Sequence, residues 1–134
     1  FIEISKIYQD KEIYSEGYKW AKKALKINSL SGDALYNFAQ VFKNAVETCG
    51  GESLNLEDKA VNQIAFKYYR EAYKKGHKGS KTMINHFRQH GDILLPTLED
   101  WFLIDDEKNE FRPIDINLSN TCYQFIDESV ERIK

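Results

Sequence analysis

Two patterns of hydrophobic and small residues dominate the first half of the chain, and both have helical spacing. In the first pattern, large, large, small and aromatic residues follow one another at steps of three, one and three. One copy consists of Phe1, Ile4, Ser5 and Tyr8, and the next, 34 residues later, of Leu35, Phe38, Ala39 and Phe42. These steps place the four side chains on one helix face, where the small residue lets a second helix approach closely.

A second helical pattern, with steps of four and three, follows each of these stretches. Its first copy is Gly17, Ala21 and Ala24, and its second copy is Ala65, Tyr69 and Ala72. The chain is therefore predicted to form two units, each an antiparallel helix pair. The predicted pairs are 1–8 with 14–27, and 33–48 with 57–75.

The second unit is longer than the first, and the extra residues fall around 46–56. Because long loops without secondary structure are uncommon, we expect longer helices joined by a loop. Gly50-Gly51 is predicted to end the first of these helices, and Asn55 or Asp58 to cap the second.

The repeating pattern stops after a third predicted helix at 80–90, whose apolar face carries Met83, Ile84 and Phe87. Residues 93–134 are predicted to fold back over the uncovered edge of this third unit, as a terminal cap does in repeat proteins. A separate domain that begins at this point is the alternative. The elements expected in this segment are a short helix at 94–101, a β-hairpin with arms 101–105 and 110–116, and a final helix capped by Ser119 or Asn120. The apolar stripe of the final helix would be Cys122, Phe125 or Ile126, Ser129 or Val130, and Ile133.

The spacing of these units resembles the tetratricopeptide repeat, and more closely its Sel-like subfamily. GDALYNFAQVF at 32–42 is similar to the first helix of such a repeat, AFKYYREAYKKGH at 65–77 to the second helix and its turn, and YKWAKKAL at 18–25 to the second helix of the preceding unit. The resemblance covers residues 1–92, about two and a half repeats. It implies an all-α fold, a short α–α superhelix or solenoid, with 93–134 as a divergent cap.

The resemblance also implies a protein-interaction or adaptor module without catalytic activity, whose concave face binds a peptide or protein partner. On that family's geometry, the concave face is lined by first-helix residues that point away from the second helix. In this chain they are Asp33, Tyr36, Gln40, Lys43 and Asn44 in the second unit, and Lys81, Asn85 and Arg88 in the third. A plain solvated helix face is the alternative for these residues.

Composition and charge refine this view. With 134 residues, 42% of them hydrophobic, the chain fits one folded domain, and it has no apolar run long enough for a membrane span. The net charge of -2 conceals an asymmetry: residues 1–94 carry 15 basic and 11 acidic side chains (+4), whereas 95–134 carry 4 and 10 (-6). We expect the two segments to pack against each other. Because the chain opens on Phe1 without signal-peptide features, we also expect a fragment of a longer protein.

The residues leave two other functions as alternatives. Basic side chains interleaved with aromatic ones at 66–90 could bind nucleic acid, but the whole chain is not basic. A helical accessory domain of a larger enzyme is the other alternative. Within the chain itself, no nucleophile or acid–base spacing indicates an enzyme.

Metal and cysteine chemistry are not indicated either. His86 and His90 have the helical spacing of metal ligands without an evident third ligand, so no metal or cofactor is expected. Cys49 and Cys122 lie 73 residues apart and lack metal-type spacing. They are predicted to be reduced thiols of a cytoplasmic protein.

Overall fold

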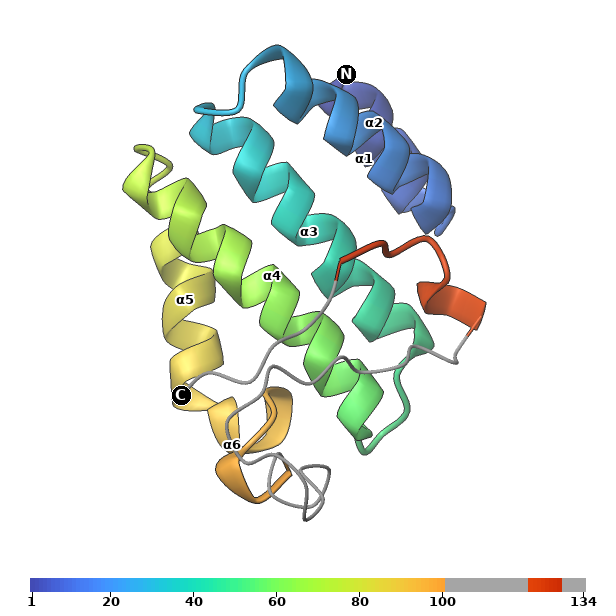
Figure 1. The fold of residues 1–134 in the computed structure, drawn as a ribbon, viewed down its shortest axis with the longest axis vertical. Coiled ribbons are helices and arrows are strands. Elements are labelled where there is room, and N and C mark those ends of the chain that lie inside the picture. The colour runs from blue at the N-terminus through green and yellow to red at the C-terminus, as the bar shows by residue number, and fades with distance from the viewer. Residues whose placement is uncertain (101–120, 129–134) are drawn as a thin grey trace, which may run out of the picture.

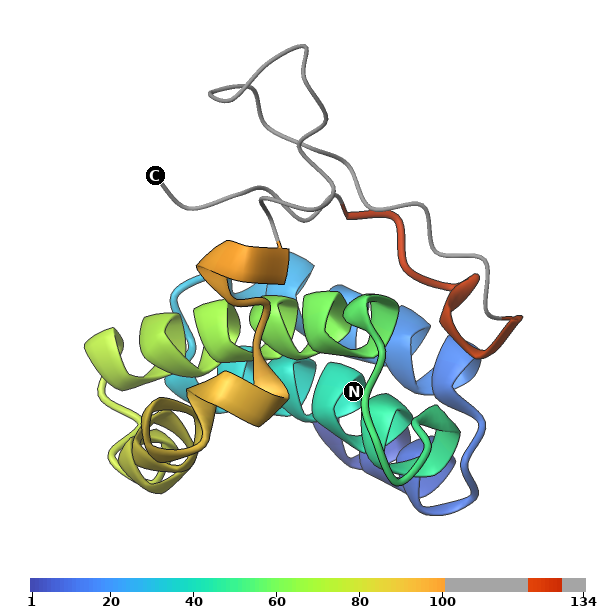
Figure 2. The same ribbon diagram turned by 90° about the horizontal axis from the view of Figure 1, so that it is seen from below.

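The computed structural model describes residues 1–100 and 121–128, which form helices and contain no strand. The longer helices are α1 (Ile2–Asp10), α2 (Tyr14–Ile27), α3 (Gly32–Cys49), α4 (Leu56–Lys74) and α5 (Ser80–Gln89). A short α6 (Gly91–Leu94) and a 3-10 turn, η1 (Thr121–Tyr123), complete them. Helices α1, α3 and α5 lie in one layer and α2 and α4 in a second (Figures 1 and 2). Over the described residues the fold is all-α.

The predicted helix pairs are confirmed, because α1 packs on α2 and α3 packs on α4. The small residues predicted for the close approaches are also confirmed: Ser5 and its counterpart Ala39 are both fully buried. In the second helices, Gly17 and Ala65 are buried at equivalent places. At these small positions the 34-residue pattern corresponds to equivalent packing, whereas Phe1 and Ile4 are exposed on the terminal helix α1 and their counterparts Leu35 and Phe38 are buried.

Gly17 is needed where α1 and α2 approach each other. A Cβ at this position would lie 3.1 Å from Cγ of Gln9 and 3.5 Å from the carbonyl oxygen of Ser5. Gly17→Val is therefore expected to lower the free energy of unfolding by about 1–3 kcal/mol through overpacking, measured by urea denaturation. Gly51→Val is the control, because a Cβ there has no contact closer than 3.8 Å. Equal losses in both variants would contradict this packing.

A buried polar network joins the first unit to the second. Ser5 Oγ donates to the Gly17 carbonyl oxygen at 2.7 Å, and Gln9 Nε2 lies 3.1 Å from Ser5 Oγ and 3.0 Å from Asn37 Oδ1. Asn44 Nδ2 donates to Gln9 Oε1 at 2.9 Å. Hydrogen bonds between buried polar groups restrict the arrangements that the helices can adopt, so this network sets how α1 sits against α3, although Asn37 Nδ2 has no partner among the described residues.

The longer second unit consists of two long helices and a short loop, as predicted. Gly50 follows the last residue of α3, and Asn55 caps α4. The cap is reciprocal: the Asn55 side chain accepts from the Asp58 N–H, and the Asp58 side chain accepts from the Asn55 N–H. Both proposed capping residues therefore take part in one capping box.

The C-terminal predictions are partly wrong. The final helix predicted from Ser119 or Asn120 is absent over the described residues 121–128, where η1 is followed by a non-helical stretch. The reason is tertiary: in this stretch Tyr123 contacts Asp58 of α4, and Phe125 contacts Tyr18 of α2 and Phe42 of α3. The short helix predicted at 94–101 begins instead at 98, after a reciprocal cap between Thr97 and Asp100. The hairpin arms at 101–105 and 110–116 lie outside the described residues.

The prediction of reduced thiols is also wrong. Cys49, at the end of α3, and Cys122, in η1, form a disulfide with their Cα atoms 6.3 Å apart. Spacing along the chain does not reveal such a pair, because only the fold brings the two residues within bonding reach. The prediction of a cytoplasmic protein rested on the reduced thiols and loses that support.

Candidate functional site

The α3 part of the predicted partner-binding face is a connected polar and aromatic cluster. The ring of Tyr36 stacks on His77 with centroids 4.1 Å apart, and Gln40 Nε2 donates to the Tyr36 hydroxyl at 3.1 Å. Gln40 also accepts a hydrogen bond from Tyr69, which is fully buried on α4. Tyr36 and Gln40 are half-buried, so these contacts hold their side chains in place before any partner arrives.

Asp33, His77 and Ser80 have the order of a catalytic triad but not its accessibility. His77 Nδ1 lies 2.9 Å from Ser80 Oγ, and His77 Nε2 lies 3.8 Å from a carboxylate oxygen of the exposed Asp33. Ser80, however, is fully buried at the first position of α5. Its hydroxyl does not face solvent, so the contact orients the turn before α5 and offers no nucleophile to a substrate.

Lys43 and Asn44 continue the predicted face along α3, but each points to a different neighbour. Asn44 belongs to the polar network with Gln9 of α1. Lys43 Nζ lies 2.6 Å from a carboxylate oxygen of Glu47, one turn further on, and its side chain lines a pocket. Of the residues of the predicted face, Lys43 is therefore the one that lines this pocket.

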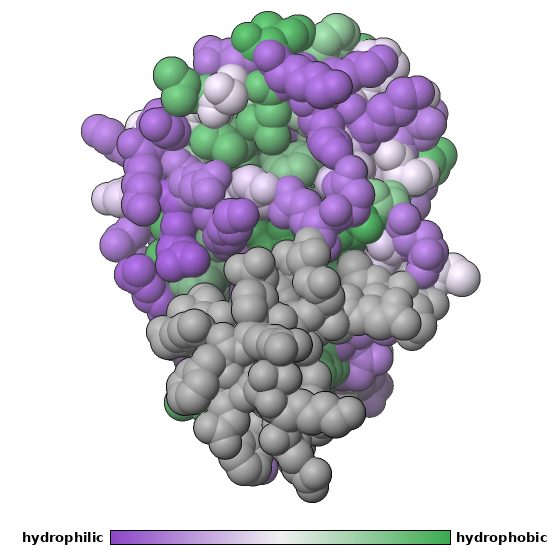
Figure 3. Space-filling model, viewed as in Figure 1, coloured by the Kyte–Doolittle hydropathy of each residue, from purple (hydrophilic) through white to green (hydrophobic). Residues whose placement is uncertain are grey.

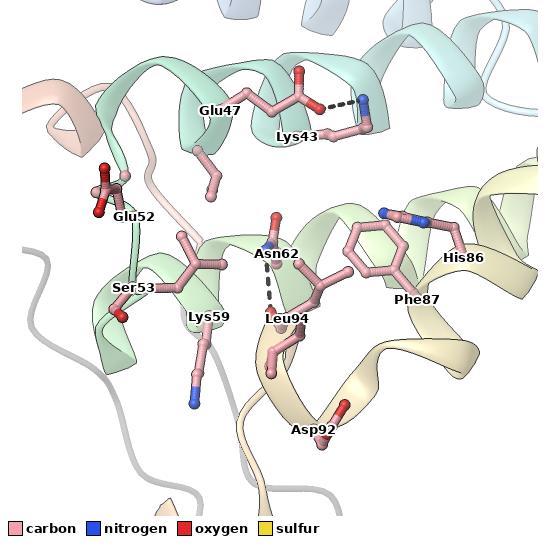
Figure 4. A pocket seen from close by; sticks show the side chains of 15 residues that line it. Lys43, Glu47, Glu52, Ser53, Lys59, Asn62, His86, Phe87, Asp92 and Leu94 are labelled. Carbon is pink, nitrogen blue, oxygen red and sulfur yellow. Dashed lines mark hydrogen bonds and ion pairs between the residues drawn. The ribbon is translucent and has the colours of Figure 1, made fainter.

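This pocket has a volume of about 520 Å³ and lies between α3, the loop after it, α4 and the end of α5 with α6 (Figure 4). Val46, Leu54, Phe87 and Leu94 contribute apolar walls, and Lys59 and His86 add polar groups. Asn62 Nδ2 donates to the Leu94 carbonyl oxygen at 3.1 Å, which fixes α6 against α4. Apolar walls with a few charged groups fit the side chains of a peptide better than a flat surface does.

The α5 part of the predicted face is arranged differently. Lys81 Nζ lies 5.4 Å from the ring centroid of Tyr73 on α4, while Asn85 and Arg88 are exposed. From α5, the pocket is lined instead by His86 and Phe87. His86 is not among the residues predicted from the family resemblance, although it lies one turn from His90, with the two ring centroids 5.2 Å apart. Among the described residues, no three potential ligands gather around a metal position.

In the basic surface at 66–90, aromatic rings are in contact with basic side chains of the same surface. Lys67 lies over Tyr68 and Arg70 over Phe66, with the cationic atoms 5.1 and 4.6 Å from the ring centroids. Lys81 covers Tyr73 in the same way. Rings with a cation over one face are less open to stacking on bases, so this surface gives no specific support to nucleic-acid binding.

Residues 121–128, here called the docked segment, lie against the layer that α2 and α4 form. Tyr123 is fully buried and donates a hydrogen bond of 2.6 Å to Asp58, and Phe125 packs on Tyr18 with ring centroids 5.2 Å apart. Lys22 Nζ lies 2.7 Å from a carboxylate oxygen of Asp127. This site was not predicted from the sequence, although Tyr123, Phe125 and Asp127 occupy every second position, the spacing by which an extended peptide places side chains on one face.

The expected attraction between the basic and acidic segments is present in two ion pairs. Lys22 pairs with Asp127, and Lys59 pairs with Asp100 at 3.4 Å. The hydrogen bond from Lys22, with a second from the Tyr18 hydroxyl, holds the pKa of Asp127 below its usual value. On the other side of the contact, burial, assisted by the hydrogen bond to Asp127, raises the pKa of Tyr18, which therefore stays a donor.

The titration of Asp127 tests this contact. A lowered pKa means that the stabilisation is complete above the ordinary Asp pKa of about 3.9 and is lost as the pH falls through the folded value. In an NMR titration of the side-chain carboxyl carbon, Lys22→Met is expected to move the Asp127 midpoint upward, toward that ordinary value. An unchanged midpoint would show that Lys22 does not act on this carboxylate. Lys19→Met, an exposed neighbour on α2, is the control.

Comparison with protein-family models, with curated proteins and with solved structures gave no significant match. Within the part of the chain that the structure describes, no helix is both long and apolar enough to cross a membrane.

Proposed function

We propose that this chain is a protein-interaction or adaptor module, a short solenoid of the tetratricopeptide type that binds a peptide or protein partner. The solenoid assignment is supported by two helix pairs with matching buried small residues, such as Ser5 and Ala39. The outer face of the α1–α3–α5 layer would be the concave, partner-binding face. The partner is a protein or peptide chain, and the module itself carries out no reaction.

The pocket beside Lys43 is the observation that carries this proposal. It joins an apolar interior, with Phe87 and Leu94, to the charged side chains of Lys43 and Lys59 at one end of the proposed face. Peptide recognition commonly combines a buried anchor side chain with polar groups that fix orientation. The half-buried Tyr36 and Gln40 extend the same face along α3 with side chains that are already held in place.

A displayed library of random peptides, selected against the purified chain, tests the proposal. We expect the selected peptides to share a consensus and Lys43→Glu to weaken their binding by about tenfold or more. Lys19→Glu makes the same charge change on an exposed position of α2 and is expected to leave binding unchanged. Failure to enrich a consensus, or equal effects of the two substitutions, would refute the proposal.

A further inference from the structure

The docked segment is bound to the helices as a peptide ligand would be. Phe125 lies against two aromatic rings, with its centroid 5.2 Å from that of Tyr18 and 6.5 Å from that of Phe42. The two acidic residues that follow accept hydrogen bonds from tyrosines of different helices, Asp127 from Tyr18 on α2 and Glu128 from Tyr68 on α4. Lys22 adds an ion pair to Asp127. These contacts join side chains to side chains, so another chain with the same side chains could make them.

The helix residues on which the segment lies form one continuous surface, here called the α2–α4 surface. It consists of Tyr18 and Lys22 of α2, Phe42 of α3 and Tyr68 of α4. The rings of Tyr18 and Tyr68 both pack on the ring of Phe42. Figure 3 shows further apolar side chains between α2 and α4, over the N-terminal half of α3, bordered by hydrophilic ones. This surface belongs to the layer opposite the proposed partner-binding face (Figure 2).

The Cys49–Cys122 disulfide fixes the segment at its N-terminal end, one residue before the buried Tyr123. A short covalent link keeps a ligand at an effective concentration on the order of millimolar, so a free competitor is excluded. Without the disulfide, the nearest covalent connection between the segment and the described helices runs along the chain from Asp100 to Thr121, a span of 21 positions. A longer connection lowers the effective concentration, and a competitor then gains access.

We propose that the α2–α4 surface is a docking site for an extended peptide in which an aromatic residue is followed, after one residue, by two acidic residues. The docked segment is its built-in competitor, and reduction of the Cys49–Cys122 disulfide releases that competitor. The site goes beyond the proposed function, because it lies on the other layer and is controlled by the redox state of one bond. The aromatic residue occupies the place of Phe125, and the acidic pair faces Lys22, Tyr18 and Tyr68.

Reduction requires a dithiol as co-reactant. Its thiolate attacks the sulfur of Cys122, which is the exposed partner, and Cys49 leaves as a thiolate that takes up a proton. The second thiol of the reductant then attacks the mixed disulfide and releases Cys122 as a thiol. Two electrons and two protons have passed to the protein, and the dithiol has become a disulfide.

A fluorescent, N-acetylated peptide of sequence YQFIDE, which corresponds to residues 123–128, is the probe. Its binding to the full chain is measured by fluorescence anisotropy before and after treatment with dithiothreitol. We expect at least about tenfold tighter binding to the reduced chain, and tighter binding still when the reduced chain carries Phe125→Ala. The matched control peptide, with Phe125→Ala and Asp127→Asn, is expected not to bind. Lys22→Met in the chain should weaken the probe, whereas Lys43→Glu should not affect it.

Three results would overturn this proposal. Equal binding to the oxidised and reduced chains would show that the disulfide does not control the surface. Absence of binding to the reduced Phe125→Ala chain would show that the surface does not accept a separate peptide. Loss of the helical circular dichroism signal on reduction would show that the disulfide maintains the fold instead. The Lys43→Glu library experiment is unaffected by any of these results, so the two proposals fail independently.

Discussion

Replacing Phe42 with Ala is expected to lower the free energy of unfolding by about 3–5 kcal/mol. Phe42 is fully buried, and its ring packs against Phe38 on the same helix and against rings from α2 and α4, with centroids 5.1–6.1 Å apart. Removal of the ring leaves a cavity at the place where α3 meets both helices of the other layer. Because these neighbours also hold each other, they have little freedom to fill it.

Tyr8→Ala is the matched control for Phe42→Ala, because Tyr8 is the equivalent residue of the first unit, 34 positions earlier. Tyr8 is only half-buried on the terminal helix α1, so we expect a loss of about 1 kcal/mol. Urea denaturation followed by circular dichroism measures both values. Equal losses would contradict the packing described here.

Asp58→Ala is expected to cost about 2–4 kcal/mol, because it removes two different interactions at once. The Asp58 carboxylate is almost fully buried, and it accepts from the Asn55 N–H at 3.0 Å and from the Tyr123 hydroxyl at 2.6 Å. Without it, α4 loses half of its capping box, and the buried Tyr123 hydroxyl loses its acceptor. Both losses fall at the same end of α4.

The measurement for Asp58 is again equilibrium unfolding, with Asp33→Ala as the control. Asp33 also occupies the first turn of a long helix, but its side chain is 82% exposed. Its removal should change the free energy of unfolding by less than about 0.5 kcal/mol. If Asp58→Ala were as mild as Asp33→Ala, the contact between Tyr123 and the start of α4 would be excluded.

The helical framework is largely predictable from local sequence. The bounds of α2 agree with its predicted range, and those of α3 and α4 lie within one residue of theirs at each end. Small residues such as Ser5 and Ala39 mark the close approaches, because a helix crossing needs them whatever the surrounding fold. Caps are similarly local, as the reciprocal pair of Asn55 and Asp58 shows.

The rest depends on residues that meet only in the folded chain. Gln9 and Asn37 have the sequence character of surface residues, yet both are buried, and the hydrogen bond from Gln9 Nε2 to Asn37 Oδ1 forms only in the folded chain. The Cys49–Cys122 bond and the docking of Phe125 likewise need the helices to be in place first. In the candidate site, Lys43 was predictable from helix position, whereas the places of His77, in the turn before α5, and of His86, on α5 itself, depend on how α5 packs on the other helices.

Chemical-shift mapping with a library-selected peptide tests most directly the central claim, that the α1–α3–α5 layer carries the partner-binding face. The proposal predicts that the largest amide shifts fall on Lys43, Glu47 and His86, around the pocket, and extend to Tyr36. Shifts concentrated on exposed positions of α2 and α4, such as Lys19 and Lys67, would contradict it.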